Sequence, residues 1–308
     1  MSRRQAPART QASHTSTRRP AARCLLAVIC LMVVAPHASS AHTQSVGLRR
    51  AASLSQVSLT PLQRQIEKER VRLSSPDAEE RRDAVQRLGA MARPESSRAA
   101  ASALGDASAA VRALAARAVL SLPGAEVAAL LIPLLRDKDE FVRRETAYAL
   151  GLARSPVATP ALVVALERDK EAGVRGAAAV ALGQIGDSSA VAALSATVVR
   201  RVRSSGFFSR ITRSRTEENE FVRRAAAISL GQIGRREAVP ALVEALSNPR
   251  AGDDVRREAA RSLGLIGDAS AIPALRAALT ARDPYLSEIA QEALRKLDPN
   301  STAPARPT

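Results

Sequence analysis

A short segment that recurs at a nearly constant interval constrains this chain more than any other feature. It reads Val, then Arg at the next position (+1), Ala or Thr at +4, Ala at +5, Leu at +8 and Gly at +9. The clearest copies lie within 141–151, 173–186, 221–234 and 254–267. Counting the Val as position 0, and adding weaker copies, the starts are Glu80, Val111, Val142, Val174, Val222, Val255 and Leu286. All steps between starts are 31–33 residues except one of 48.

The spacing inside each copy predicts a helix. Positions 0, +4, +8 and +11 fall on one helical stripe, which is apolar and would be buried. A second helix is predicted between successive copies, in 159–166, 239–246 and 272–279, each with Pro in its first turn, where no intrahelical amide is lost. Aromatic residues make up only 2% of the chain, while Ala and Leu are abundant, which suits closely packed helices.

Each period is therefore one antiparallel helix pair. One pair cannot bury its own apolar face, so the pairs must stack. The sequence predicts an all-α fold, an α-solenoid of about seven stacked antiparallel helix pairs over residues 59–297. Thr60 and Pro61 predict the start of an amino-terminal capping helix that ends near Leu73. The Gly-Gln-Ile-Gly and Gly-Leu-Ile-Gly segments are interpreted as helix ends with a left-handed Gly, not as phosphate loops.

With these motifs, residues 76–297 resemble the HEAT-repeat family, specifically the short HEAT-like repeats first named from phycobilisome lyases. The Thr-Pro-Leu-His signature of ankyrin repeats and the fixed aromatics of tetratricopeptide repeats are missing. The resemblance implies a HEAT-like superhelix. It also implies a ladder of ion pairs between the Arg at +1 and an acid in the turn. The pairs expected here are Asp106 with Arg112, Asp139 with Arg143, Asp169 with Arg175, and Asp253 with Arg256.

In relatives the helices with the Val-Arg motif line the concave side, which implies that positions +2, +3, +6 and +10 contact a partner. The residues expected there are Arg117, Arg144, Tyr148, Gln184, Arg224, Gln232, Arg257 and Arg261. Of these, Arg144, Tyr148, Arg224, Arg257 and Arg261 are predicted to bind a partner. A mostly basic groove suits an acidic or extended partner. The alternative is that exposed arginines on an Ala-rich helix only keep the protein soluble.

The single 48-residue step indicates an insertion at about 200–217. Its residues 200–215 contain six arginines, no acid and two adjacent Phe. Insertions in solenoids form surface loops, often on a binding face. The predicted partner-binding residues are Arg200, Arg201, Arg203, Phe207, Phe208, Arg210, Arg213 and Arg215. They would bind anionic lipid headgroups, an acidic protein or a polyanion. In the alternative, this is a solvated loop whose two Phe side chains fold over the neighbouring groove.

The repeats lack the residues that most catalysis requires. Both cysteines, Cys24 and Cys30, and all three histidines lie at or before residue 42. Thiol nucleophiles, imidazole bases and most metal-ligand sets are thereby excluded from the repeats, and we expect no catalytic, cofactor or metal site. Some HEAT-like relatives are chromophore lyases, for which no motif can be mapped, or di-iron hydroxylases, whose His-Glu ligands are missing here. Adjacent acids such as Glu217 and Glu218 are expected at turns or helix starts, where the helix dipole favours them.

The amino terminus predicts an export signal. Residues 1–23 carry six Arg and no acid, residues 24–35 are apolar, and small residues follow up to Ala41. This order is typical of a Sec-type signal peptide, and 12 apolar residues are few for a membrane span. Alternatives are a plastid transit peptide, a weak twin-arginine signal, or an uncleaved helix that anchors the protein to a membrane. Residues 42–58 are interpreted as a flexible linker, and 298–308 as a disordered tail.

Together these features predict a non-catalytic protein-interaction scaffold that is periplasmic or extracellular. Its partner would be a protein, acidic or extended, with a membrane surface as a further partner of the 200–215 loop. No small-molecule substrate is evident. Nucleic-acid binding, for which the arginines would suffice, is the alternative if residues 1–41 are not an export signal.

Overall fold

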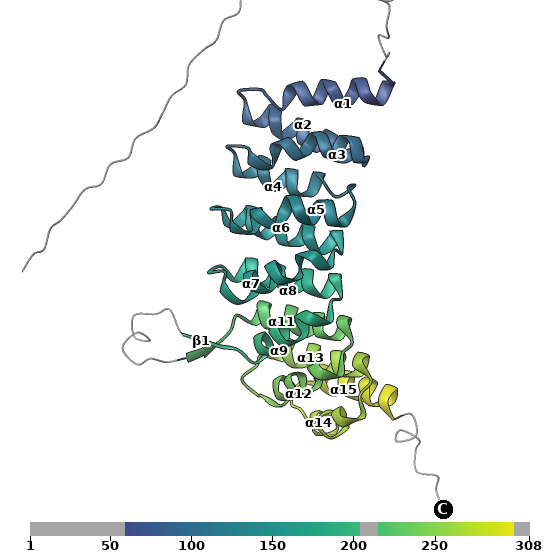
Figure 1. The fold of residues 1–308 in the computed structure, drawn as a ribbon. Helices are drawn as coiled ribbons and strands as arrows, with labels where there is room; N and C mark the ends of the chain where they lie inside the picture. Colours follow the sequence, from purple (N-terminus) through teal and green to yellow (C-terminus); the bar gives the residue numbers. More distant parts are fainter. Residues whose placement is uncertain (1–58, 204–214, 299–308) are drawn as a thin grey trace, which may run out of the picture. The chain divides into compact units, whose positions relative to one another are not determined.

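The computed structural model describes residues 59–203 and 215–298, and every structural statement below concerns these residues. The chain divides into two units, Met1–Ser58 and Leu59–Thr308, and all the described residues belong to the second. Within this unit, helix pairs stack in chain order, as Figure 1 shows from α1 to α15. The fold class predicted from the sequence, an all-α solenoid of about seven helix pairs, is confirmed.

Each of the seven described pairs, here called repeats 1 to 7, contains one helix with the recurring pattern and one without it. The motif helices are α2 (Ala78–Ala90), α4 (Ala109–Ala118), α6 (Glu140–Ala153), α8 (Ala172–Ile185), α11 (Glu220–Ile233), α13 (Asp253–Ile266) and α15 (Pro284–Leu297). The companion helices are α1 (Pro61–Arg72), α3 (Pro94–Ala100), α5 (Gly124–Leu131), α7 (Thr159–Arg168), α9 (Val191–Val198), α12 (Val239–Ser247) and α14 (Ile272–Ala278). Successive motif helices pack against one another, and each companion packs on its own motif helix.

Short 3-10 helices complete the companion helices. Two of them, Ala101–Gly105 and Ile132–Arg136, follow α3 and α5 directly. The other four precede α7, α9, α12 and α14 and span Pro156–Ala158, Ser188–Ala190, Arg236–Ala238 and Ala269–Ala271. The sequence pattern did not predict these turns, because three to five residues are too few to show a period.

The helix ends follow the predicted local chemistry. The Thr60 hydroxyl accepts a hydrogen bond from the Gln63 N–H at 3.2 Å, and the Gln63 side chain accepts one from the Thr60 N–H at 2.8 Å. This capping box, with Pro61 as first residue, starts α1 as expected. Gly186, Gly234 and Gly267 end α8, α11 and α13 with φ of 77°, 72° and 77°, the left-handed conformation that Gly adopts without strain.

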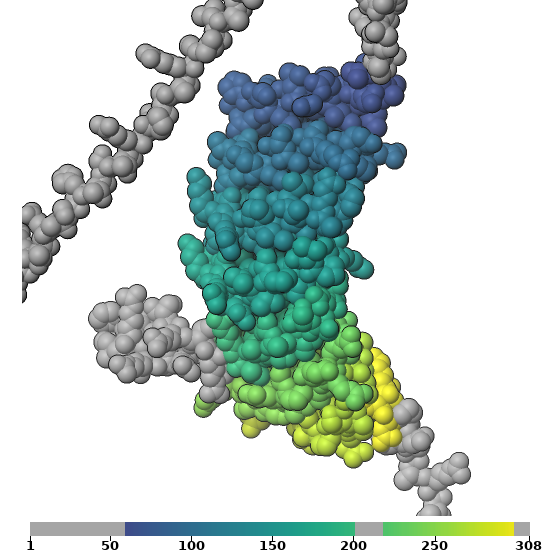
Figure 2. Space-filling model, viewed as in Figure 1, coloured from purple at the N-terminus to yellow at the C-terminus, as the bar shows by residue number. Residues whose placement is uncertain are grey.

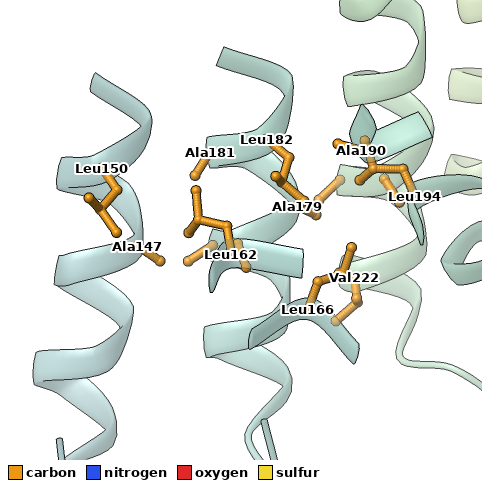
Figure 3. Packing of buried hydrophobic residues seen from close by; sticks show 14 of the residues in the cluster. Ala147, Leu150, Leu162, Leu166, Ala179, Ala181, Leu182, Ala190, Leu194 and Val222 are labelled. Atoms are coloured by element: carbon orange, nitrogen blue, oxygen red, sulfur yellow. The ribbon is translucent and has the colours of Figure 1, made fainter. Parts of the chain in front are cut away.

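The core runs through the stack as one continuous apolar layer. Val142 and Leu150, at positions 0 and +8 of repeat 3, are completely buried, as the helical stripe predicted. Figure 3 shows Leu150, Leu162 and Leu182, from the successive helices α6, α7 and α8, in the same cluster. In the space-filling view each repeat abuts the next (Figure 2).

Glycine at position +9 lets successive motif helices approach closely. A Cβ at Gly231 would lie 2.8 Å from Cβ and 3.0 Å from Cα of Ser262, which is position +7 of the next repeat. Gly151 stands in the same relation to Ala181, whose Cα would be 2.7 Å away. Such distances are too short for carbon atoms, so these positions exclude any side chain. In repeats 3 and 5, Gly at +9 is therefore required for packing between repeats, beyond any role at a helix end.

The two ends of the insertion form a β-ribbon, which was not predicted. The sequence analysis expected a loop, whereas β1 (Arg201–Arg203) and β2 (Arg215–Glu217) form a two-stranded antiparallel ribbon, with Val202 opposite Thr216. Below the ribbon, the Glu218 N–H donates to the Arg200 carbonyl at 2.9 Å. Pairing of the two chain segments satisfies backbone groups that a helix would otherwise satisfy. The ribbon leaves the stack between α9 and α11 (Figure 1).

Candidate functional site

A ladder of ion pairs connects the turns of successive repeats, but with different partners from those expected. In repeats 1 to 4, the Arg at +1 pairs with the acid that precedes the next motif helix. Arg112 makes two hydrogen bonds of 2.8 Å to Asp137, and Arg143 makes bonds of 2.7 and 3.0 Å to Asp169. The first rung joins Arg81 to Asp106 in the same way, at 2.7 and 2.9 Å.

The expected pairing of Asp106 with Arg112, Asp139 with Arg143 and Asp169 with Arg175 is therefore wrong. Within its own repeat, Arg112 donates Nη1 to the backbone carbonyl of Asp106, at 2.8 Å, and not to its carboxylate. Asp139 instead caps the start of α6, because its carboxylate accepts the N–H groups of Phe141 and Val142. The expected ion pair of Asp253 with Arg256 is present, at 3.9 Å, but it lies within α13 and does not connect two repeats. The arginines are structural, as the resemblance implied.

The acid ladder continues through the insertion. Glu218 is completely buried and accepts two hydrogen bonds from Arg175, at 2.6 and 3.1 Å. Arg200 is a further cation near the same carboxylate, at 3.6 Å. The expectation that Glu218 only complements a helix dipole is therefore incomplete: it takes the place that Asp137 and Asp169 hold in earlier repeats. The ribbon therefore ends directly before a ladder acid, Glu218, whose backbone N–H pairs with the Arg200 carbonyl at the base of the ribbon.

The ladder changes after the insertion. Arg223, at +1 of repeat 5, is buried and donates to the carbonyl oxygens of Val198 and Ala251, at 2.7 and 3.3 Å. In repeat 6 the +1 residue, Arg256, donates to the Leu246 carbonyl at 3.0 Å. The residue at +2, Arg257, makes the bidentate pair with Asp283 instead, at 2.7 and 3.0 Å. Arg257 was predicted to contact a partner, but the structure places it in the ladder.

The ladder arginines also shift the pKa of their acids. The hydrogen bond from Arg81 holds the pKa of Asp106 below its usual value, against the opposing effect of burial. The hydrogen bond from Arg257 lowers the pKa of Asp283 in the same way. These acids remain charged at neutral pH and are held as hydrogen-bond acceptors. A general acid or base needs a pKa near the working pH, so the shifts fit a structural role.

The remaining arginines predicted on the motif helices lie at the surface, and acids face them. In repeats 5 and 6, Arg224 lies 3.5 Å from Asp254 and 3.8 Å from Glu258, and Arg261 makes a 2.8 Å hydrogen bond to Glu258. This part of the face is therefore of mixed charge, where the sequence analysis expected a mostly basic groove.

In repeats 2 and 3 the pairing is looser. Arg117 of α4 and Arg144 of α6 each lie 3.8 Å from the same carboxylate, that of Glu145. At that distance neither contact is a hydrogen bond. The Arg144 guanidinium also lies over the ring of Phe141, 5.2 Å from its centre.

Two hollows lie beside these arginines on the motif helices. The first has a volume of about 390 Å³. It is lined by Arg82, Gln86, Ala110, Ala113, Leu114, Arg117, Phe141 and Glu145. The second has a volume of about 350 Å³ and is lined by Arg117, Glu145, Tyr148, Ala149, Leu152 and Gln184. Because Arg117 and Glu145 line both, the hollows form one groove across α2, α4, α6 and α8. We call it the four-helix groove. It brings together Tyr148, Arg117 and Gln184, which were predicted to contact a partner.

Exposed apolar side chains continue along the motif helices. Phe141, Phe221 and Tyr285 precede position 0 in repeats 3, 5 and 7 and are exposed. Leu152 and Leu265, at +10 of repeats 3 and 6, are exposed by 56% and 58%. Position +10 was predicted to contact a partner, but Leu152 and Leu265 were not named there, and the position before the motif was not considered. Their recurrence at fixed offsets from the motif is the signal that could have identified them.

The predicted residues of the insertion are only partly described. Arg200 is half-buried and donates to the Glu167 carbonyl at 2.9 Å, so it belongs to the base of the ribbon. The two strands contain Arg201, Arg203 and Arg215, of which the structure describes the backbone. Phe207, Phe208, Arg210 and Arg213 lie outside the described residues, as do residues 1–58 and the tail after Asp298.

The described residues contain neither a candidate metal centre nor a membrane span. Within 59–203 and 215–298, no three His, Cys, Asp or Glu side chains are grouped so that they could hold a metal ion. In the same residues, no helix has the length and apolar character needed to cross a bilayer.

The sequence matches the family of HEAT repeats over residues 70–151, 128–205 and 210–295. No curated protein matches this chain. Among solved structures, a chain of the CpcE–CpcF complex of phycocyanin lyase from Nostoc sp. is similar at 23% identity and a TM-score of 0.45, covering 80% of this chain and 91% of that one. Human deoxyhypusine hydroxylase is similar at 20% identity and 0.36, covering 76% and 96%. A designed armadillo repeat protein is similar at 18% and 0.38, covering 76% and 100%.

Proposed function

Since this chain belongs to the HEAT-repeat family, we propose that it is a non-catalytic scaffold that binds a protein partner on the exposed face of its motif helices. Repeat scaffolds of this kind present extended surfaces that suit protein partners. The ladder and the core account for the buried arginines and the buried apolar stripe. What remains on the motif helices is a set of side chains with no evident structural task.

The observation that carries the proposal is a set of exposed apolar residues on the motif helices, two of which, Phe141 and Leu152, line the four-helix groove. Single exposed apolar residues are ordinary on any protein surface. Here Phe141, Leu152, Phe221, Leu265 and Tyr285 recur at two fixed positions of the repeat, on four motif helices. An apolar set of this kind, rimmed by charged side chains, is typical of a protein-binding surface.

Site-specific photo-crosslinking tests this proposal. A photoreactive amino acid replaces Leu152, 56% exposed on the motif helix α6, or Val164, 48% exposed on the companion helix α7. Both residues are apolar, similarly exposed and in neighbouring helices, so they are matched. In the native cell, a discrete crosslinked protein is expected from position 152 and not from 164. Equal crosslinking at both positions, or crosslinking at 164 alone, contradicts a binding site on the motif helices.

The proposal extends to export. Residues 1–41 have the order of a Sec-type signal peptide, and we propose that the mature scaffold lies in the cell envelope or the secreted space. Sequencing the amino terminus of the protein from its native cell is the test. A start near His42 is expected, and a protein that retains Met1 contradicts export by cleavage.

The insertion is proposed as a second contact, for an acidic partner or an anionic membrane surface. It carries six arginines within residues 200–215, on a ribbon fixed to the repeats through Glu218. Sedimentation with vesicles of phosphatidylglycerol, against vesicles of phosphatidylcholine, tests the membrane part. Replacing Arg201, Arg203, Arg210, Arg213 and Arg215 by Ser is expected to abolish binding to the anionic vesicles. Arg200 is kept because it contacts the repeats. Unchanged binding contradicts the assignment.

A further inference from the structure

The four-helix groove has features that specify its ligand more closely than "a protein". We propose that it binds an extended peptide segment of the partner in which two apolar residues stand three positions apart with an acidic residue between them. This inference rests on the proposed function and names the partner chemistry for one part of the motif-helix face.

The apolar requirement comes from the two hollows. Leu114 and Phe141 line the first, and Tyr148 and Leu152 line the second. Each hollow therefore offers one aliphatic and one aromatic side chain. Burying an apolar side chain against such a surface contributes about 1.5–3 kcal/mol when burial is complete, which makes the two hollows the natural anchoring points for a ligand.

The spacing comes from the helix packing. The first hollow is lined from α2, α4 and α6 and the second from α4, α6 and α8, so they are displaced by one motif helix. Packed helices lie about 8–10 Å apart. A polyproline II chain advances about 3.1 Å per residue and presents every third side chain on the same face. Side chains three residues apart in an extended peptide therefore match the two hollows.

The acidic requirement comes from the charges between the hollows. Arg117 is 64% exposed, whereas Glu145, its only nearby acid among the described residues, is 17% exposed and lies equally close to Arg144. One carboxylate thus faces two guanidinium groups, and neither contact, at 3.8 Å, is a hydrogen bond. The N–H groups of Arg117 remain available for a carboxylate of a ligand, which they would hold by charge-assisted hydrogen bonds.

Two residues outside the groove serve as controls for the test. Arg261, in repeat 6, occupies the same +6 position as Arg117. It is 51% exposed but is hydrogen-bonded to Glu258 at 2.8 Å. Val164, on the companion helix α7, is 48% exposed and is the control for Leu152, which is 56% exposed. Each control therefore matches a side chain of similar exposure inside the four-helix groove.

The experiment uses the full chain and two fluorescent peptide pools, with binding followed by anisotropy. Both pools have Leu residues three positions apart; the positions between them are Glu in the acidic pool and Gln in the neutral pool. The acidic pool is expected to bind about tenfold more tightly, because a charge-assisted contact is worth roughly that factor. Arg117→Ser should remove this tenfold difference, and Leu152→Ser should weaken both pools. Arg261→Ser and Val164→Ser should change neither.

Equal binding of the two pools overturns the acidic requirement, and an equal loss in Arg117→Ser and Arg261→Ser overturns the assignment to the four-helix groove. If neither pool binds, the peptide chemistry is wrong. That result is separate from the proposed function, which fails only if the photo-crosslink at position 152 is no stronger than that at 164. The thermal unfolding of each variant, monitored by circular dichroism, shows that the exposed substitutions leave the fold intact.

Discussion

Repeats 1–4 and repeats 5–7 share one fold and one repeat pattern but present different surfaces. In repeat 3 the +1 residue, Arg143, forms the ladder with Asp169, which leaves the +2 residue, Arg144, at the surface over Phe141. In repeat 6 the +1 residue contacts a backbone carbonyl, and the +2 residue, Arg257, forms the ladder with Asp283. The ladder is thus formed by the arginine at +1 in repeat 3 and by the arginine at +2 in repeat 6.

The difference teaches that arginine content does not measure the charge available to a ligand. Arg117 and Arg261 stand at the same position of the repeat. The acid near Arg261 is on its own helix three residues earlier and is hydrogen-bonded to it, whereas the acid near Arg117 belongs to the next repeat and lies at 3.8 Å. Of these two arginines, Arg117 beside the four-helix groove therefore has the charge that is more available to a ligand.

Removing a ladder arginine should destabilise repeats 1–4 and repeats 5–7 to different extents, and this is the largest effect we expect. Arg143→Ala is expected to lower the free energy of unfolding by about 3–5 kcal/mol, because it leaves the carboxylate of Asp169 buried and unpaired. Arg257→Ala should cost less, because Arg257 is more exposed and also contacts Asp254. Urea unfolding measures both. An equal loss in the two variants would remove this distinction between the regions.

Packing between repeats should be the same in the two regions. Gly151→Ala and Gly231→Ala should each destabilise the protein by about 1–3 kcal/mol, because the added Cβ overlaps the next motif helix. Gly105→Ala is the matched control, since nothing lies within 4 Å of its added Cβ. Thermal unfolding of the three variants tests this. If only one of the first two is destabilised, the motif helices do not pack alike throughout.

Acid should weaken the ladder in both regions. The pKa values of Asp106 and Asp283 are below their usual range, chiefly through hydrogen bonds from Arg81 and Arg257. A carboxyl group with a lowered pKa in the folded state stabilises the fold above its unfolded pKa of about 3.9, and this contribution is lost as the pH falls. Stability should therefore decrease below about pH 4. Asp106→Asn should be less stable at pH 7 and lose less on acidification. A parallel loss in wild type and variant would contradict the assignment.

The helix ends should show the smallest effect. Gly ends α8, α11 and α13 in the left-handed conformation, whereas Arg154 holds the same conformation after α6, with φ of 49°. Arg154→Gly should therefore stabilise the protein by about 0.5–1 kcal/mol through relief of the left-handed strain. Arg168→Gly, within α7, is the control and should destabilise it. Denaturant midpoints distinguish the two, and a loss of stability in Arg154→Gly would show that its side chain contributes more than its backbone costs.

Local sequence determined much of this protein. Helices, their ends and the number of pairs follow from residues within one turn of each other, such as Thr60 with Gln63 and the Gly residues after α8, α11 and α13. The buried stripe follows from the helical period, which is why Val142 and Leu150 could be assigned to the core.

Only the tertiary structure decided which groups meet across repeats. Arg112 has one acid 6 residues before it, Asp106, and another 25 residues after it, Asp137. It hydrogen-bonds to the carboxylate of the more distant Asp137 and not to that of Asp106. The reason for Gly at +9, the role of Glu218 at the base of the ribbon and the ladder role of Arg257 were equally hidden. A repeat pattern fixes the environment along one helix. The partner of a side chain that points to the next helix depends on how two neighbouring repeats stack. The sequence of one repeat does not contain that information.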